Sequence, residues 1–400
     1  MNILIIGGGA GGMMAALTAL QKAQNHVTLV ERQARVGRKL LSTGNGRCNL
    51  TNRQVSPAHY HGQRSDFCRF ALEQFGTDST LDFFENLGLT TVTESDGKVY
   101  PRSNMANSVL DVLRFAMAQH GEQLESVLGD PVAELKQSKS GFVATLESGR
   151  AIRADKVILC AGGCAGSKVG GVMDGYKIAQ SLGHHRTALY PALVQIKTDP
   201  TYPRSLKGVK TEADITLLRG KETVAKNRGE ILFTEYGVSG PAIFEISRYA
   251  VGERLSVELD LWAEKDENGV FDWLKSRRHF VPDCGSALVG VLHNRLAQVV
   301  VKAAGLSPAE PFETLTASQL HTLAHTCKHF TLPVTGTCGF DQAQVTAGGL
   351  VTDEFDPGTM QSRLVPGFYA CGEVLDIDGD CGGFNLQWAW SSGHLAGQVL

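Results

Sequence analysis

Short apolar runs near both ends of the chain predict buried β-strands. Residues 3–6 form a continuous apolar run, residues 27–30 are apolar except for Thr28, and an alanine-rich segment that begins at Ala10 lies between them. Residues 156–160 and 367–371 have the same apolar character, and glycines follow each of them closely. Runs of this length with glycines at their ends are typical of parallel strands that are covered on both faces. The pattern therefore predicts an α/β architecture around a parallel sheet.

The middle of the chain follows a different pattern. From residue 190 to residue 262, strand-like runs such as "ADITLLRG" and "RLSVELDLW" follow one another with polar turns between them. Residues 263–330 have helical patterns instead, as in "SALVGVLHNRLAQVVVKAAG". We therefore expect an inserted domain over residues 190–337, mostly β over 190–262 and mostly helical over 263–330.

A glycine fingerprint directly follows the first predicted strand. Gly7, Gly9 and Gly12 are spaced as GxGxxG, a helical segment follows, and the second strand ends at Glu31. This order of strand, glycines, helix, strand and acid is typical of dinucleotide binding, because the glycines allow the pyrophosphate to approach the backbone at a helix N-terminus. The acid would then accept hydrogen bonds from the adenosine ribose. An ordinary tight turn is the alternative, and it does not explain the complete series.

The segment after Glu31 favours FAD over a nicotinamide cofactor. A nicotinamide dehydrogenase would continue with further strand–helix units, whereas this chain continues with "RQARVGRKLLSTGNGRCNLTN". Arg32, Arg38 and Lys39 are suited to neutralising a diphosphate, and the small residues that follow suit close packing against a flat ring. No second GxGxxG unit with its acid follows later, so a separate NAD(P)H domain is not predicted.

The loop of residues 42–52 has alternative interpretations. Arg47 is either a ligand contact or a solvated surface charge, and its position between glycines and amides favours a ligand contact. Cys48 is either a nucleophile or a packed thiol, and the packed thiol is the commoner case. The formal glycosylation sequon of residues 49–51 is expected to be idle because no secretory signal precedes it.

Two later glycine-rich segments are expected to return to the same cofactor. Ala161 and Gly162 follow the strand of residues 156–160, and the CxxxC pair of Cys160 and Cys164 is interpreted as structural rather than redox-active. Near the C-terminus, Gly372 and Glu373 precede a glycine turn and a helix that starts at about Asn385. The N-terminus of that helix would face the flavin and favour negative charge on its reduced form. Trp388 and Trp390 either stack near the flavin or pack in the interior.

The residues expected to contact FAD come from both ends and the middle of the chain, and the sequence assigns no catalytic residue. The residues are Gly7, Gly9, Ala10, Gly11, Gly12, Glu31, Arg32, Arg38, Lys39, Gly46, Arg47, Cys48, Asn49, Val132, Ala161, Gly162, Gly372, Glu373, Gly383, Phe384, Asn385 and Leu386.

Composition excludes several other classes of protein. The chain has 400 residues and a formal net charge of −3, which gives no electrostatic argument for binding nucleic acid or an anionic membrane. Its nine cysteines contain no CxxC pair, so a disulfide framework is not expected. No apolar run approaches the roughly 20 residues that a membrane-spanning helix needs. Because the chain begins directly with an apolar strand, we expect no targeting peptide and a cytoplasmic protein.

A histidine-rich segment near residue 325 offers possible metal ligands. His321, His325, Cys327 and His329 lie close together in the sequence, and histidines four residues apart share one face of a helix. The segment has no HExxH glutamate, and we found no second group of ligands. The sequence therefore favours a solvated helix face over a metal site.

Three segments of the chain resemble one known family. "GRKLLSTGNGRCNLTN", "GEILFTEYGVSGPAIFEISRY" and "VTAGGLVTDEFDPGTMQSRLVPGFYACGEVLDIDGDCGGFNLQWAWSSGHLAG" are similar to the BaiN-like, aminoacetone-oxidase family of FAD-binding proteins, and the resemblance spans essentially the whole chain. It implies a bacterial flavoprotein with a discontinuous FAD domain and an inserted domain on the substrate side. Activities assigned in the family include amine oxidation and the reduction of enone-type steroids. The chain departs from the family at "CAGGCAGSKVGGVMDGY", which lacks the usual Ser-Tyr-Pro.

The sequence as a whole predicts an FAD-dependent oxidoreductase with a discontinuous Rossmann-type domain of residues 1–189 and 338–400. FAD is expected to be noncovalent, the substrate to be a small organic molecule, and NAD(P)H to be the electron donor. The alternatives are a flavin oxidase that uses oxygen and a non-catalytic flavin-binding module that responds to redox state.

Overall fold

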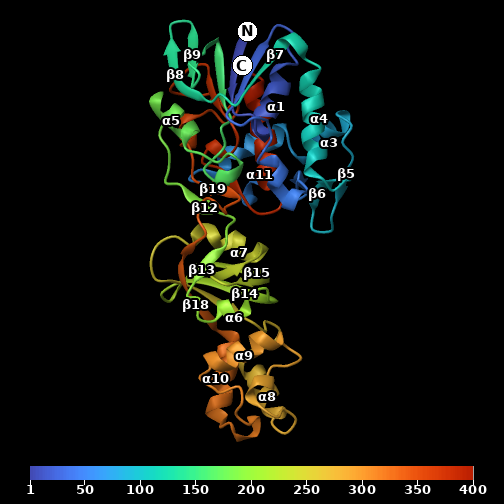
Figure 1. Cartoon of the computed structure of the whole chain (residues 1–400), viewed down its shortest axis with the longest axis vertical. Coiled ribbons are helices and arrows are strands. Elements are labelled where there is room, and N and C mark those ends of the chain that lie inside the picture. The colour runs from blue at the N-terminus through green and yellow to red at the C-terminus, as the bar shows by residue number, and fades with distance from the viewer. Residues whose placement is uncertain (400) are drawn as a thin grey trace. The chain divides into compact units, whose positions relative to one another are not determined.

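The computed structural model describes residues 1–399 and divides into two compact units (Figure 1). Unit 1 comprises Met1–Pro191 and Ala343–Leu400, and unit 2 comprises Ala192–Gln342. The chain thus leaves unit 1 once and returns to it once. Among residues 1–399, no helix combines the length and the apolar character that crossing a membrane would require.

The centre of unit 1 is a five-stranded parallel sheet in the order β20-β11-β1-β2-β7. The strands are β1 (Asn2–Ile6), β2 (His26–Glu31), β7 (Leu124–Leu128), β11 (Lys156–Leu159) and β20 (Phe368–Ala370). β2 and β11 both pair with β1, so the chain continues on opposite sides of the first strand. In an open parallel sheet, the crevice at such a reversal of strand order is where ligands bind.

Two helices of unit 1 approach each other closely because small residues face each other. α1 (Ala10–Ala19) and α11 (Phe384–Gly397) are apolar on nearly all sides, as expected for buried helices. A Cβ atom built at Gly393 would lie 2.6 Å from the carbonyl oxygen of Gly11, and one built at Gly397 would lie 2.6 Å from that of Ala15. Larger side chains would push the two helices apart, so this contact holds the C-terminal helix against the first βαβ unit.

Further elements complete unit 1. Its other helices include α2 (Arg69–Gln74), α3 (Thr77–Asn86), α4 (Ala106–Ala118) and α5 (Asp174–Ser181). One small sheet contains β10 (Ala151–Ala154), β9 (Gly141–Leu146) and β8 (Val132–Ser138), and a second contains β3 (Thr51–Asn52), β6 (Lys98–Pro101) and β5 (Thr91–Thr93). Two further sheets have two strands each: β21 (Asp378–Gly379) with β4 (Tyr60–His61), and β12 (Tyr190–Ala192) with β19 (Val345–Ala347).

Unit 2 is built on a closed barrel with the order β13-β16-β15-β14-β17-β18. Its strands are β13 (Ile196–Thr198), β14 (Lys210–Arg219), β15 (Glu222–Thr234), β16 (Gly237–Ser239), β17 (Leu255–Asp260) and β18 (Phe330–Thr337), with α6 (Pro203–Leu206) and α7 (Pro241–Ile246) beside them. β18 closes the barrel because it pairs with both β13 and β17.

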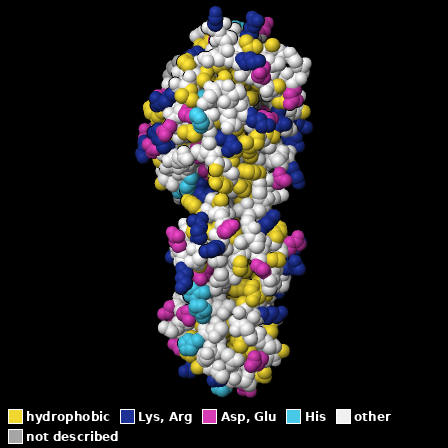
Figure 2. Space-filling view, turned by 90° about the vertical axis from the view of Figure 1, so that its left-hand side faces the viewer, with side chains coloured by type: hydrophobic (Ala, Val, Ile, Leu, Met, Phe, Trp, Pro, Cys, Tyr) yellow, Lys and Arg dark blue, Asp and Glu magenta, His cyan; other side chains and the backbone are white. Residues whose placement is uncertain are grey.

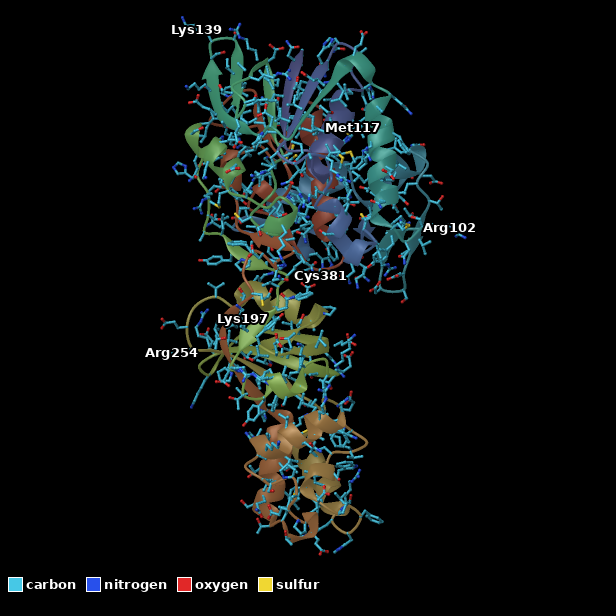
Figure 3. All side chains as sticks on the ribbon, viewed as in Figure 1. Arg102, Met117, Lys139, Lys197, Arg254 and Cys381 are labelled. Atoms are coloured by element: carbon cyan, nitrogen blue, oxygen red, sulfur yellow. The ribbon has the colours of Figure 1, made fainter. Side chains whose placement is uncertain are left out.

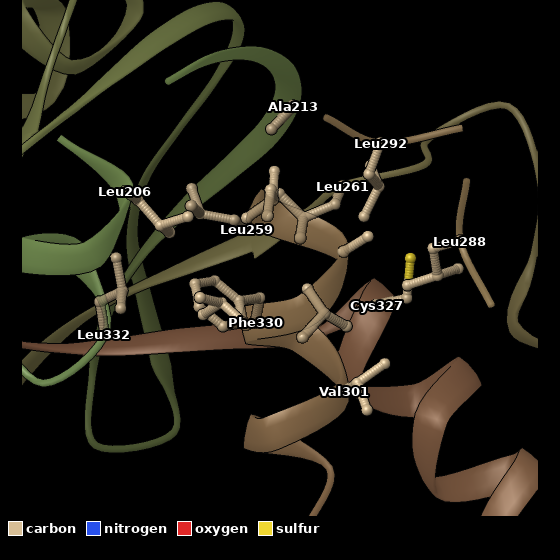
Figure 4. Close-up of a cluster of buried hydrophobic side chains, with 14 of the residues drawn as sticks. Leu206, Ala213, Leu259, Leu261, Leu288, Leu292, Val301, Cys327, Phe330 and Leu332 are labelled. Atoms are coloured by element: carbon tan, nitrogen blue, oxygen red, sulfur yellow. The ribbon is translucent and has the colours of Figure 1, made fainter. Parts of the chain in front are cut away.

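The helical part of unit 2 is inserted between β17 and β18. It contains α8 (Glu267–Ser276), α9 (Asn294–Ala303) and α10 (Ala317–Lys328). One hydrophobic cluster joins barrel residues such as Leu259 and Phe330 to helical residues such as Val301 and Cys327 (Figure 4). The helices and the barrel of unit 2 therefore share a core, and truncating either part would expose the other.

The predicted fold class, a Rossmann-type α/β fold with β and helical parts in an insertion, is confirmed. The sequence patterns predicted neither the closure of the barrel nor the origin of its last strand, β18, from beyond the helical segment. Closure depends on the pairing of β13 with β18, and these strands are separated by the entire insertion.

Candidate functional site

The candidate site lies where β1, β11 and β20 end and glycine loops begin. A Cβ atom built at Gly9, Gly162 or Gly372 would meet no atom within 4 Å. The flanking glycines of the fingerprint serve packing instead, since a Cβ at Gly7 would lie 2.4 Å from Cys160 O and one at Gly12 would lie 1.9 Å from Gly7 O. This division, with one glycine for the turn, one left open and one for close packing, is what dinucleotide binding requires.

Glu31 is in position to close the glycine loop. Its carboxylate accepts hydrogen bonds from the backbone N–H of Gly8 at 2.7 Å and from that of Gln33 at 2.8 Å. An ionised carboxylate has about four acceptor positions, so these two bonds leave capacity for hydroxyl donors of a ligand. Glu31 thus has a structural role in the loop in addition to its predicted role as a ribose acceptor.

The three basic residues predicted to contact the diphosphate have different partners. Lys39 Nζ lies 2.7 Å from Glu373 Oε2, and the other oxygen of Glu373 accepts from Thr346 N at 2.9 Å. Arg32 contacts Asp174 at 3.4 Å, and Arg38 donates to the side chain of Gln33 at 2.6 Å. The fold thus brings together Lys39 and Glu373, two predicted site residues from opposite ends of the sequence.

The loop of residues 42–49 combines left-handed backbone positions with one buried thiol. Its 3-10 helix (Leu40–Gly46) contains Asn45 at a φ of 56°, and Cys48 follows at 60°. Cys48 is fully buried, and burial raises the pKa of its thiol to about 12, so it is a poor nucleophile. Gly46 has a left-handed φ of 84°, and a Cβ atom built there would meet only Leu41 O, at 4.0 Å.

Arg47 and Asn49, which flank Cys48, differ in how they are satisfied. The Arg47 guanidinium lies 3.9 Å from the centroid of the Tyr100 ring and 2.6 Å from Glu94 Oε1, an arrangement typical of a surface ion pair. Asn49 is buried, and its Oδ1 atom has no hydrogen-bond partner. A buried polar atom without a partner is costly, which marks Asn49 rather than Arg47 as the residue of this loop that is ready for a ligand.

The turn before α11 is rigidly braced. Asn385 Oδ1 accepts from Gly379 N at 2.8 Å, and Asn385 Nδ2 donates to Gly379 O at 2.8 Å. Gly383 precedes the helix at a φ of 100°, and a Cβ there would lie 2.5 Å from Thr51 O and 2.9 Å from Asn49 Oδ1. Because no side chain caps the helix, the N–H groups of the first turn, which includes Phe384 and Leu386, remain available to an acceptor.

The two tryptophans of α11 belong to the interior. Trp388 and Trp390 are 1% and 0% exposed. Trp388 Nε1 donates to Gly372 O at 3.1 Å, and Trp390 Nε1 donates to Leu50 O at 3.0 Å. Both indoles therefore anchor backbone segments of the site from within the core, in agreement with the packing alternative.

A pair of histidines on one carboxylate was missed in the sequence. Asp380 accepts from His59 Nδ1 at 3.0 Å and from His61 Nε2 at 2.6 Å. The His59 ring stacks on Phe384, the first residue of α11, at 4.4 Å between centroids. The His-x-His spacing of residues 59–61 was an available signal, although His59 ends a 3-10 helix (Pro57–His59) and His61 ends β4, so no strand periodicity places them together. Its partner Asp380 lies in the same glycine-rich turn as Cys381, which Figure 3 labels.

Cysteines at two strand ends also come together. Cys160 Sγ lies 3.1 Å from Cys371 Sγ, and burial raises the pKa of the Cys160 thiol well above its usual value. Cys164 Sγ instead contacts Met173 Sδ at 3.0 Å. The thiol next to Cys160 is therefore that of Cys371, which follows the neighbouring strand β20, and not that of Cys164 in the CxxxC spacing.

The remaining predicted residues occupy two places. Ala10 and Gly11 form the first turn of α1, and Ala161 precedes the open Gly162. Val132 is the first residue of β8 and pairs with Leu146 in the separate antiparallel sheet. The fold thus gathers most predicted positions around the glycine loops, while Val132 lies on a different sheet.

Comparison with known proteins gives the same picture as the geometry. Residues 1–399 match the family described as "HI0933-like protein Rossmann domain". A 3-dehydro-bile acid delta(4,6)-reductase of Clostridium scindens is 38% identical over 100% of this chain and 98% of its own length. A ribosomal RNA dihydrouridine synthase of Escherichia coli is 31% identical over 100% of this chain and 98% of its own length.

Among solved structures, an Escherichia coli quinol fumarate reductase chain superposes with a TM-score of 0.50. It is 18% identical, and the match covers 99% of this chain and 69% of that chain, a likeness that concerns the fold alone. The family match and the match to the bile acid reductase span nearly the whole chain, so they are stronger evidence than the structural likeness. Both agree with the glycine loops and Glu31 described above. The chain belongs to the HI0933-like Rossmann domain family and is a flavoprotein oxidoreductase.

Proposed function

We propose that FAD binds along the carboxyl ends of β1, β11 and β20 and that the protein reduces a carbon–carbon double bond conjugated with a carbonyl group. The observation that carries the cofactor assignment is the set of three glycines, Gly9, Gly162 and Gly372, at which a side chain would enter open space. The unpartnered Asn49 Oδ1 beside the turn of Gly383 supports it independently.

Each part of the site has a role in this proposal. Glu31 accepts hydrogen bonds from the ribose hydroxyls, and Lys39 and Arg38 balance the charge of the diphosphate. Asn49 and the free N–H groups at the start of α11 hold the polar edge of the flavin ring. The aliphatic and aromatic interior behind them, which includes Trp388, keeps water away from the buried side of the site.

The reaction class follows from what two relatives have in common. A 3-dehydro-bile acid with delta(4,6) unsaturation contains double bonds conjugated with a ketone, and the uracil ring that becomes dihydrouridine contains a double bond conjugated with a carbonyl. Both substrates are polarised so that the carbon distant from the carbonyl accepts a hydride and the adjacent carbon accepts a proton. NAD(P)H is the proposed electron donor that would reduce the bound FAD, and the reduced flavin would then supply the hydride.

The proton can be held by this chain itself. His59 is fixed on two sides, by Asp380 through Nδ1 and by Phe384 through ring stacking, so Nε2 is the nitrogen left for a substrate. An imidazole positioned by a carboxylate is a common general acid. We place His59 in this role because Phe384 starts the helix whose N-terminus holds the flavin edge in the proposal.

The decisive experiment separates the two half-reactions under anaerobic conditions. The purified protein is mixed with NADH or NADPH while flavin absorbance is followed, and the reduced protein is then mixed with a 3-oxo-delta(4,6) steroid or with an unmodified ribosomal RNA transcript. We expect rapid flavin reduction by one nicotinamide cofactor and reoxidation by a conjugated carbonyl compound. Reoxidation by air alone, faster than by any such compound, would favour the oxidase, and failure of every donor would favour the non-catalytic module.

The choice between a small substrate and RNA also has a physical argument. The formal net charge is −3, and on the face in Figure 2 the Lys and Arg side chains are interspersed with Asp and Glu. RNA binding depends on neutralising phosphates with clustered positive charge. The surface therefore favours a small molecule, and dihydrouridine formation in the RNA arm of the experiment would reverse this choice.

The role of His59 has its own test. We expect His59→Gln to leave the rate of flavin reduction by NAD(P)H unchanged and to slow substrate reduction by about 10²–10⁴-fold, the usual contribution of a general acid. His61→Gln is the matched control, because it touches the same carboxylate without stacking on Phe384. Equal losses in both variants would assign the effect to Asp380 and its turn rather than to His59.

A further inference from the structure

The helical part of unit 2 contains a cluster of metal-binding side chains from three elements. His325 and His329 come from the last turn and the C-terminal end of α10, and Glu267 is the first residue of α8. One ligand atom from each of these three residues lies within 4.8 Å of the others. Glu258 of β17 stands behind His329. The sequence favoured a solvated helix face because it shows no HExxH glutamate and no second group of ligands near the histidines, and Glu267 lies 58 residues before His325.

We propose that Glu267, His325 and His329 bind a divalent zinc-like cation. Zinc bonds to nitrogen and oxygen of about 2.0–2.2 Å place tetrahedral ligand atoms about 3.3–3.5 Å apart. Glu267 Oε2 lies 3.0 Å from His325 Nδ1 and 3.8 Å from His329 Nε2, so the three atoms surround a position of this size. Two imidazoles and one carboxylate leave the fourth tetrahedral position for water.

The position of Glu258 behind His329 favours metal binding. The Nδ1 atom of His329 lies 3.3 Å from Glu258 Oε1, so the carboxylate would favour a proton on Nδ1 and leave Nε2, which lies 3.8 Å from Glu267 Oε2, for the cation. A carboxylate behind a ligating histidine is a recurrent feature of zinc sites and increases the basicity of the ligand. A simple ion pair of His329 with Glu267 would not need this second carboxylate.

The other groups around the cluster do not compete for its ligands. Lys328, the nearest cation in sequence, pairs with Asp260 at 2.6 Å and donates to Trp262 O at 2.9 Å. Of the other two residues in the histidine-rich segment, His321 stacks on Phe271 at 3.7 Å and Cys327 is fully buried in the core. The structure thus removes two of the four ligands considered in the sequence and supplies Glu267 and Glu258.

The site would link the start of α8 to the end of α10. Asp266, the N-cap residue of α8, accepts a hydrogen bond from Gly269 N, and Thr316, the N-cap residue of α10, forms a capping box with Gln319. Backbone N–H groups at the start of each helix thus have side-chain acceptors of their own. The cation would link the two helices through side chains alone. Because the ligands are 41–60% exposed, metal can enter from solvent without unfolding.

Zinc binding to the full-length, flavin-containing protein tests this proposal. After dialysis against a chelator, calorimetric titration with zinc is expected to show saturable binding of one ion per chain. His325→Ala, His329→Ala and Glu267→Gln should each weaken it at least tenfold, and Glu258→Ala about ten- to a hundredfold. His321→Ala, a change on the same helix outside the cluster, is expected to bind zinc as the unmodified protein does.

Two outcomes would overturn the proposal. The first is the absence of saturable zinc binding, which would make the cluster a set of half-exposed ion pairs. The second is unchanged affinity in His325→Ala and His329→Ala, which would place the ion elsewhere. Because Cys338 and Cys381 are partly exposed, the titration is repeated after alkylation of accessible thiols, and we expect the same affinity. In crystals grown with zinc, anomalous scattering should locate the ion between α8 and α10.

Discussion

The two units of this protein treat the ends of their β-strands in opposite ways. In unit 1, parallel strands stop at glycines such as Gly9 and Gly372, where a side chain would enter open space. In unit 2, the strands close on one another into a barrel, and residues such as Ile215, Phe233 and Val257 fill its interior. A parallel sheet leaves backbone N–H groups and helix ends at one edge for a ligand, whereas a small closed barrel uses its strands for packing. The comparison separates positions that await a ligand from positions that are already satisfied.

The largest expected effect comes from the packing glycine of the fingerprint. We expect Gly12→Ala to abolish flavin binding and the stable fold of unit 1, because its Cβ would lie 1.9 Å from Gly7 O. Gly9→Ala is the matched control, since its Cβ meets no atom within 4 Å and the fold should be retained. Circular dichroism checks the fold, and flavin titration of Gly9→Ala should still show a loss of affinity. Full affinity in Gly9→Ala would mean that the open space beside Gly9 is not the cofactor site.

A core truncation in unit 2 should act on stability without acting on the cofactor. Phe330 is 1% exposed and lies between the barrel and the helices, so Phe330→Ala should cost about 3–5 kcal/mol of unfolding free energy. Trp262 and Trp273 pack edge to face in unit 2, whereas Trp388 and Trp390 lie in unit 1. Flavin fluorescence therefore reports on unit 1 during urea unfolding, and a change in tryptophan fluorescence without flavin release reports on unit 2. If Phe330→Ala releases flavin at the same urea concentration as the unmodified protein, the two units unfold independently. If the urea concentration for flavin release falls together with the stability of unit 2, the units unfold together.

Glu31 should have a smaller effect that is specific to unit 1. Glu31→Ala removes the acceptor for Gly8 N and for the proposed ribose hydroxyls, a loss of about 1.5–3 kcal/mol in binding. The dissociation constant for FAD should therefore rise by roughly ten- to a hundredfold. Glu94→Ala serves as the control, because it breaks only the surface pair with Arg47 and should leave FAD affinity unchanged. A loss of FAD affinity in Glu94→Ala would indicate that Arg47, which Glu94 holds in place, contacts the cofactor as the sequence predicted.

The smallest effect concerns reactivity rather than stability. With its pKa raised to about 12, Cys48 is protonated at pH 8, and only about one thiol in ten thousand is a thiolate. We expect thiol reagents to modify the partly exposed Cys338 and Cys381 first and to leave Cys48 unmodified in the folded protein. The rate at which Cys48 is modified should rise about tenfold per pH unit below pH 12, as long as the protein stays folded, because the thiolate fraction rises tenfold per unit. Rapid labelling of Cys48 at pH 8, detected by peptide mass, would contradict its burial.

The C-terminal helix shows why one simple experiment is not informative. Deleting residues 372–400 would remove Trp388, Trp390 and Leu395 from the core of unit 1, so loss of flavin would follow from unfolding. Asn385→Pro is compromised in a similar way, because the Asn385 side chain holds Gly379 through two hydrogen bonds. The single-residue changes above avoid this difficulty because they leave α11 and its turn intact.

The sequence by itself determined much of unit 1, because the constraints there are local. A strand followed by GxGxxG, a helix and a second strand ending in an acid can fold in few ways, since each glycine is required within a few residues of its neighbours. The same local signals located the glycine turns at Gly162, Gly372 and Gly383 and the starts of α5 and α11. Family membership confirmed the resulting fold class.

Only the tertiary structure decided which distant residues meet. It placed Lys39 beside Glu373, Cys160 beside Cys371, and the His59–His61 pair on Asp380. It also closed the barrel through β13 and β18 and brought Glu267 to the histidines of α10. These contacts depend on packing between segments far apart in the chain, and hydrophobic periodicity specifies which face of an element is buried but not which element covers it.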